Sequence, residues 1–191
     1  YGGLDLLERA RIATGLPVVT ELMSTDDIDY FVEHVDVIQI GARNMQNYDL
    51  LRALGRSEKP VLLKRGVGAT LQELLLSAEY LLAAGNPRVM LCERGIRTFD
   101  TFTRGTLDLA AVPALHEMTH LPVLVDPSHA AGRAALVAPM ALAAAACGAD
   151  GVMVEMHPDP LHARCDGAQA LLPEELAALS QRLHAVREAC R

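Results

Sequence analysis

The sequence lacks any hydrophobic run long enough to cross a membrane. Hydrophobic residues make up 51% of the 191 residues, but charged residues interrupt them throughout, and a membrane-spanning helix needs about 20 consecutive apolar residues. The most apolar segment, residues 141–146, is short and is followed by Cys147 and Gly148, as expected of a buried helix. The sequence therefore predicts a soluble protein with no membrane partner.

Cysteine is scarce as well. The four cysteines form no CxxC pair, and no secretory signal sequence is recognisable, so we expect a cytoplasmic protein without a disulfide framework. Each cysteine is expected to be a small buried or surface residue and not a metal ligand. They are Cys92, Cys147, Cys165 and Cys190.

An excess of basic residues is also absent. Seventeen Lys and Arg residues stand against 24 Asp and Glu residues, which gives a formal net charge of −7. Non-specific binding of nucleic acid depends on clustered Lys and Arg, so we expect no nucleic-acid partner. An anionic substrate would need a local cationic pocket.

Short segments rich in valine, isoleucine and leucine alternate with longer segments of helical spacing. Such short apolar runs are typical of parallel strands that are buried on both faces. Residues 71–84 have apolar side chains at helical spacing, and Thr70 with Glu73 predicts a capping box at the start of this helix. The predicted strands are residues 16–21, 36–41, 60–64, 88–93, 122–126 and 151–155.

This alternation predicts parallel strands joined by right-handed crossovers, in either a doubly wound sheet or a (β/α)₈ barrel. Nearly every predicted strand ends in polar residues, which suits a barrel with its active site at the carboxyl ends of the strands. The GxGxxG fingerprint of a dinucleotide-binding sheet is missing. We therefore predict an α/β fold of the TIM (β/α)₈ barrel type, as a single domain over residues 1–191. Because only six strands are recognisable, we expect the first one or two βα units to be absent from this sequence.

His129, Glu155 and Asp166 are the candidate metal ligands. Glu155 directly follows the apolar residues 151–154, and His129 follows another apolar strand by a few residues. An imidazole and two carboxylates suit a divalent transition metal. A single histidine or glutamate in a loop is more often structural, so this prediction depends on the position of these residues at strand ends.

Cationic residues follow three neighbouring predicted strands. Arg43 comes after one strand, Lys64 and Arg65 end the next, and Arg94 and Arg97 follow a third. At the carboxyl ends of buried strands, such side chains can contact a phosphate group. Lys64 alone would also permit a Schiff-base aldolase. The surrounding cations favour a phosphorylated substrate instead.

Several linked motifs, in the same order, closely resemble the 3-deoxy-D-arabino-heptulosonate 7-phosphate synthases (phospho-2-dehydro-3-deoxyheptonate aldolases) of the shorter bacterial type. The resemblance covers essentially the whole chain. It rests on residues 40–47, 62–66, 91–98, 125–130, 154–160 and 166–169.

The resemblance implies a metal-dependent enzyme that condenses phosphoenolpyruvate with erythrose 4-phosphate, the first step of the shikimate pathway. In this reaction C3 of phosphoenolpyruvate adds to the aldehyde, water attacks C2, and phosphate leaves by C–O cleavage. The family's divalent metal, here expected to be Mn, Fe, Co or Zn, is held by a Cys, a His, a Glu and an Asp, of which the last three match His129, Glu155 and Asp166. The residues that match the family's phosphoenolpyruvate ligands are Ala42, Arg43, Lys64 and Arg94.

Glu93 and Asp126 are further catalytic candidates, as groups that orient Lys64 or handle protons, although ionic contacts at this rim could equally be structural. The family's first-strand Cys ligand and its Lys-Pro-Arg-Thr segment have no counterpart here. Three alternatives remain open: the related octulosonate 8-phosphate synthase, a non-catalytic barrel remnant with a regulatory or assembly role, and the Schiff-base aldolase. We also expect a homo-oligomer.

Overall fold

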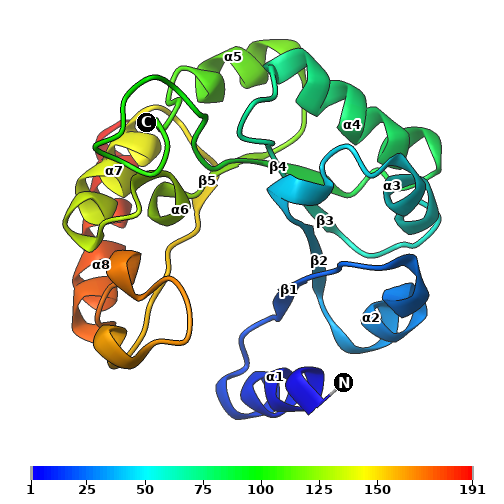
Figure 1. Cartoon of the computed structure of the whole chain (residues 1–191), viewed down its shortest axis with the longest axis horizontal. Coiled ribbons are helices and arrows are strands. Elements are labelled where there is room, and N and C mark those ends of the chain that lie inside the picture. The colour runs from blue at the N-terminus through cyan, green and yellow to red at the C-terminus, as the bar shows by residue number, and fades with distance from the viewer. Residues whose placement is uncertain (1, 191) are drawn as a thin grey trace. The chain divides into compact units, whose positions relative to one another are not determined.

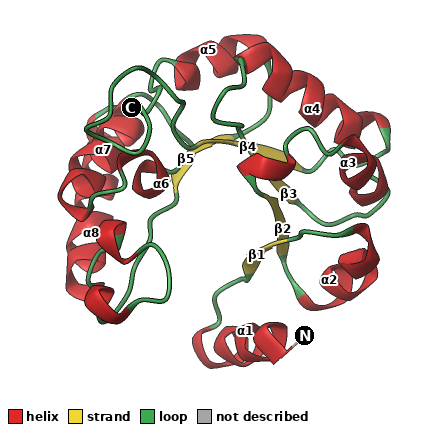
Figure 2. Cartoon of the chain, in the orientation of Figure 1, coloured by secondary structure: helices red, strands yellow, loops and turns green. Residues whose placement is uncertain are grey.

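The computed structural model of the chain describes residues 2–190 (Figure 1). Helices and strands alternate along the chain (Figure 2). The strands form one sheet in the order β1-β2-β3-β4-β5-β6. The chain divides into two compact units, the first made of residues up to Gly66 with Thr70–Leu91, and the second of Val67–Ala69 with the residues from Cys92 onward.

The first unit contains three parallel strands and the helices that connect them. Strand β1 pairs with β2 with Val19 opposite Val37, and β2 pairs with β3 with Ile38 opposite Val61. Short 3-10 turns follow β1 at Thr25–Asp27 and β2 at Ala42–Asn44. The elements are α1 (Gly2–Thr14), β1 (Val19–Glu21), α2 (Ile28–His34), β2 (Val37–Ile40), α3 (Tyr48–Leu54), β3 (Val61–Lys64), α4 (Leu71–Ala83) and the start of β4 (Val89–Glu93).

The second unit begins with the end of β4. Strands β5 and β6 are parallel, with Leu124 opposite Gly151. Two 3-10 turns, Pro160–His162 and Gly167–Gln169, interrupt the long segment after β6. The other elements are α5 (Ala111–Met118), β5 (Val123–Val125), α6 (Pro127–Ala131), α7 (Ala134–Ala146), β6 (Gly151–Val152) and α8 (Pro173–Ala189).

Burial of the strands explains their composition. All four residues of β3 are buried, and Ile38 and Ile40 of β2 are completely buried. In the second unit, α7 packs on α8 through a core of Val137, Ala141, Leu171 and Leu179. The apolar segment 141–146 is therefore part of a packed helix. Among the described residues, no helix combines the length and the apolar character that crossing a bilayer requires.

The predicted helix at residues 71–84 is confirmed as α4. The Thr70 hydroxyl accepts a hydrogen bond from the backbone N–H of Glu73 at 3.2 Å, and the Glu73 carboxylate accepts one from the backbone N–H of Thr70 at 2.8 Å. This capping box satisfies two N–H groups that the helix itself leaves without partners. The carboxylate is stabilised in its charged form, so the backbone N–H of Thr70 lowers the pKa of Glu73.

The alternating α/β prediction is confirmed, and each predicted strand contains an observed one, although the observed strands are shorter. The last strand was expected to run to Glu155 but ends at Val152. The N–H of Met153 still donates to the carbonyl of Val125 at 2.9 Å, but the backbone N–H of Glu155 donates to the Ser128 hydroxyl at 2.9 Å and not to a neighbouring strand. The single-domain assignment stays a prediction.

Candidate metal centre and phosphate site

His129 is oriented by a short helix that begins directly after β5. Asp126 is completely buried and caps this helix, because its Oδ1 accepts from the backbone N–H of His129 at 3.0 Å. Its Oδ2 lies 2.8 Å from the Nδ1 of His129. If the Asp126 carboxylate accepts this hydrogen bond, Nδ1 carries the proton, and a neutral imidazole then has Nε2 available as a metal ligand. Carboxylates often fix metal-binding histidines in this way.

Glu155 is positioned through its backbone. Its N–H donates to the buried hydroxyl of Ser128, in the same helix as His129, and its carbonyl accepts from Leu171 at 3.0 Å. Met156 continues this link by bridging to Leu171. The segment that carries Glu155 is therefore fixed on one side to α6 and on the other to the residues just before α8.

Asp166 precedes the Gly167–Gln169 turn in a left-handed conformation, with φ of 54° and ψ of 17°. Among the described residues it is the only non-glycine with a positive φ. Aspartate tolerates this region better than most residues, but the conformation is sparsely populated. Strained backbone of this kind is often found at functional sites, where the surrounding structure maintains it.

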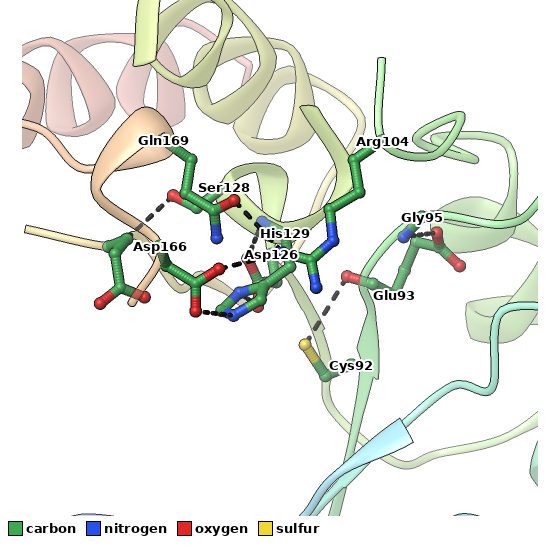
Figure 3. Close-up of polar contacts among 10 residues, drawn as sticks. Cys92, Glu93, Gly95, Arg104, Asp126, Ser128, His129, Asp166 and Gln169 are labelled. Atoms are coloured by element: carbon green, nitrogen blue, oxygen red, sulfur yellow. Dashed lines mark hydrogen bonds and ion pairs between the residues drawn. The ribbon is translucent and has the colours of Figure 1, made fainter. Parts of the chain in front are cut away.

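The three predicted ligands lie together in the second unit, and Figure 3 shows His129 and Asp166 side by side. One ligand atom from each of His129, Glu155 and Asp166 lies within 4.8 Å of the other two, and all three residues are partly buried. The Nε2 of His129 is 3.8 Å from the Oδ2 of Asp166. One imidazole nitrogen and two carboxylate oxygens form a donor set that suits Mn, Fe, Co or Zn. These residues therefore fit a divalent metal ion.

Arg94 lies at the end of β4 and is 9% exposed. Burial lowers the pKa of its guanidinium, the charge of Asp126 raises it in opposition, and the nearby charge of Arg104 lowers it further. Arginine nevertheless remains protonated in proteins. Arg94 is thus a cation with little access to water, and such a cation forms stronger contacts with an anion than an exposed one does.

Glu93, the last residue of β4, is completely buried. Its Oε1 accepts from the backbone N–H of Gly95 at 2.6 Å (Figure 3). It also accepts from the backbone N–H of Asp108 at 3.5 Å, so its carboxylate fixes both ends of the loop that follows β4. Its carbonyl also accepts from the N–H of Asp126 at 2.8 Å. These contacts give Glu93 a structural role, and its predicted catalytic role stays a prediction.

The remaining predicted substrate ligands lie in the first unit. Lys64 and Arg65 are both 5% exposed at the end of β3. Arg43 is largely exposed beside Ala42, and its guanidinium lies 3.9 Å from the carboxylate of Glu21. Positively charged side chains therefore lie at the end of β3 and in the turn that follows β2.

Sequence reasoning did not select two residues that the structure connects to these sites. The Oε1 of Glu21 is buried without a hydrogen bond. The carboxylate of Glu21 lies against Gly41, in the space that a Cβ would need if residue 41 were not glycine. Its signal in the sequence is a glutamate at the end of a predicted strand. Arg104 donates to Asp166 at 3.0 Å (Figure 3). A lone arginine in a loop of small and polar residues gives no comparable signal.

Parallel β/α architecture with a cluster of His, Glu and Asp in the segments that follow two neighbouring strands suits a metal-dependent α/β enzyme. The model of the DAHP synthetase I family matches residues 1–191. The chain belongs to this family.

Individual relatives agree with this assignment. The phospho-2-dehydro-3-deoxyheptonate aldolase of Thermotoga maritima is 50% identical over 187 residues, which cover 98% of this chain and 55% of the relative. A solved truncated form of 3-deoxy-D-arabino-heptulosonate 7-phosphate synthase from the same organism has a TM-score of 0.96 at 50% identity, over 98% of this chain and 72% of that one. The 2-dehydro-3-deoxyphosphooctonate aldolase of Syntrophotalea carbinolica is 33% identical, over 88% of this chain and 64% of the relative. This chain thus spans about half the length of the curated Thermotoga relative.

Proposed function

We propose that this chain provides the metal-binding and phosphoenolpyruvate-binding parts of an enzyme that condenses phosphoenolpyruvate with erythrose 4-phosphate. The products are 3-deoxy-D-arabino-heptulosonate 7-phosphate and phosphate. The observation that carries the proposal is the cluster of His129, Glu155 and Asp166, whose ligand atoms lie within 4.8 Å of one another. The 50% identity to a phospho-2-dehydro-3-deoxyheptonate aldolase supports the choice of reaction.

His129, Glu155 and Asp166 would hold a divalent metal ion, which when bound supplies a Lewis acid for the aldehyde oxygen of the sugar phosphate. Asp126 keeps the proton of His129 on Nδ1 and so directs Nε2 toward the metal position. Ser128 fixes the backbone at Glu155. The buried residues Asp126 and Ser128 thus orient the ligands His129 and Glu155.

Arg94 would bind the phosphate of phosphoenolpyruvate, because a buried guanidinium forms strong charge-assisted hydrogen bonds with phosphate oxygens. We assign Ala42, through its backbone, with Arg43 and Lys64, to the same substrate. These groups neutralise negative charge and hold the reacting carbons together, which lowers the entropic cost of joining two substrates. Burial of Lys64 is compatible with this role.

We also propose that the six strands belong to a TIM (β/α)₈ barrel that forms a single domain. Support comes from the parallel pairing of the strands and from a TM-score of 0.96 to a longer synthase chain. In such a barrel the carboxyl ends of all strands contribute to one active site. A cytoplasmic location and a homo-oligomeric state stay predictions.

The related octulosonate reaction uses the same donor with a different aldose. Relatives named 2-dehydro-3-deoxyphosphooctonate aldolase are 29% to 33% identical to this chain, compared with 50% for the heptulosonate relative. The difference favours erythrose 4-phosphate as the acceptor.

Phosphate release from phosphoenolpyruvate by the enzyme that contains this chain tests the proposal. We expect release to require erythrose 4-phosphate, to be much slower with arabinose 5-phosphate, to stop with EDTA and to return with Mn²⁺ or Zn²⁺. Unchanged release in EDTA would contradict metal dependence. Trapping of a substrate on Lys64 by borohydride would instead support the Schiff-base alternative.

A further inference from the structure

Arg104 lies in the loop that joins β4 to α5, outside the residues proposed to bind metal or substrate. Its Nη1 donates to the Oδ1 of Asp166 at 3.0 Å and lies 3.4 Å from the Oε1 of Gln169 (Figure 3). Gln169 is almost completely buried, so the guanidinium reaches between a buried amide and a candidate ligand.

We propose that Arg104 is a positioning residue for the metal site, which holds the Asp166 carboxylate so that one oxygen is directed toward the metal. This inference rests on the proposed metal site. Arg104 occupies Oδ1, and the other oxygen, Oδ2, faces the Nε2 of His129 at 3.8 Å. The two carboxylate oxygens therefore face different groups, one the guanidinium of Arg104 and the other the imidazole of His129.

The backbone of Arg104 is anchored to the helix that carries His129. Its N–H donates to the carbonyl of Ala131 at 3.3 Å, and the N–H of the following glycine donates to the carbonyl of Ala130 at 2.8 Å. Gly132 ends this helix at φ of 65°, and a Cβ built there would lie 2.8 Å from the Cβ of Arg104. This close approach fixes Arg104 relative to His129 and explains the glycine.

Asp166 depends on such support because its own conformation is unfavourable. Its left-handed backbone is sparsely populated for residues other than glycine. The bond from Arg104 joins the Asp166 turn to the loop after β4, which is 62 positions away in the sequence. Without that bond the Asp166 carboxylate could rotate. Metal binding would then have to fix its orientation, which would weaken the metal affinity.

A guanidinium close to a metal ligand also has an opposing effect, since its positive charge repels a dication. The two effects predict opposite changes in metal affinity when Arg104 is removed: loss of orientation weakens binding, and loss of repulsion strengthens it. Partners that orient metal ligands typically contribute 10- to 100-fold to metal affinity. About half of the Arg104 side chain is exposed to solvent, which screens its repulsion. We therefore expect orientation to dominate.

Metal affinity, measured by competition with a chromophoric chelator for Mn²⁺ and Zn²⁺, tests this inference independently of turnover. Arg104→Ala should bind both metals roughly 10- to 100-fold more weakly than the wild type. Arg104→Lys, which keeps the charge, should recover part of the loss. Arg164→Ala removes an equal charge from an exposed position two residues before Asp166, and it should bind metal as the wild type does.

His129→Ala separates failure of the inference from failure of the metal site. If the wild type binds metal and His129→Ala does not, but Arg104→Ala binds as tightly as the wild type or more tightly, the positioning role is wrong and the metal site stands. If wild type and His129→Ala bind equally, both are wrong. Circular dichroism verifies folding, and should Arg104→Ala not fold, Arg104→Gln provides the same comparison with the same expected weakening.

Discussion

Gly132→Ala perturbs the contact between α6 and the loop that carries Arg104. A left-handed alanine costs about 1–2 kcal/mol, and about 0.4–1 kcal/mol of this is offset because alanine restricts the unfolded chain. The new Cβ would also lie 2.8 Å from the Cβ of Arg104, so one segment must move. Forcing an extra carbon into a packed contact costs about 1–3 kcal/mol. We expect a net loss of about 1–5 kcal/mol of stability, with displacement of Arg104.

Gly148→Ala is the matched control, because Gly148 also has a positive φ, of 92°, but no atom lies within 4 Å of a Cβ built there. Both glycines lie in the second unit. Denaturant unfolding and metal affinity are measured on both variants. Both should be destabilised, but only Gly132→Ala should bind metal more weakly. Equal metal affinities in the two variants would refute the reasoning that the Gly132 contact positions Arg104.

Two further outcomes follow from charged groups. Arg94→Ala should raise KM for phosphoenolpyruvate roughly 10- to 150-fold, from the loss of a charge-assisted contact worth about 1.5–3 kcal/mol, and an equal rise for the aldose in steady-state kinetics would contradict the assignment. The backbone N–H of Val18 lowers the pKa of Asp36 in the folded protein. The stabilisation by Asp36 is therefore present above its unfolded pKa, about 3.9, and disappears as the pH falls through its lower folded pKa. Denaturant unfolding should show that the wild type has a larger free energy of unfolding than Asp36→Asn, and that this difference shrinks as the pH falls through this range. A difference that stays constant with pH would contradict the assigned role of Asp36.

Local patterns were sufficient to predict most of the secondary structure. The strand at Val61–Lys64 was recognisable because burial of all four residues demands a short apolar run. The capping box of Thr70 and Glu73 is a local interaction and was predicted from spacing alone. The contact that takes the backbone of Glu155 away from strand pairing was not predictable, because it is made with a hydroxyl 27 positions away in the sequence.

His129 and Glu155 were predicted from their positions after apolar strands, since parallel strands bring such positions to one edge. Asp166 does not directly follow a predicted strand, and its prediction relied on the family resemblance. The structure brings His129, Glu155 and Asp166 together, and their role as ligands stays a prediction. Arg104 was not predictable, because its contact with Asp166 depends on how a loop folds against α6 and on the positive φ of Gly132. No periodic pattern in the sequence indicates that the loop of Arg104 packs this closely against α6.

The most direct test of the account is to measure bound metal and aldose-dependent phosphate release together, in the enzyme that contains this chain and in its His129→Ala variant. His129 is partly buried, and its ring contacts acidic side chains, so alanine should leave the circular dichroism spectrum largely unchanged. We predict that the variant loses both metal and turnover. A folded His129→Ala protein that keeps its full metal content and full activity would contradict the central claim.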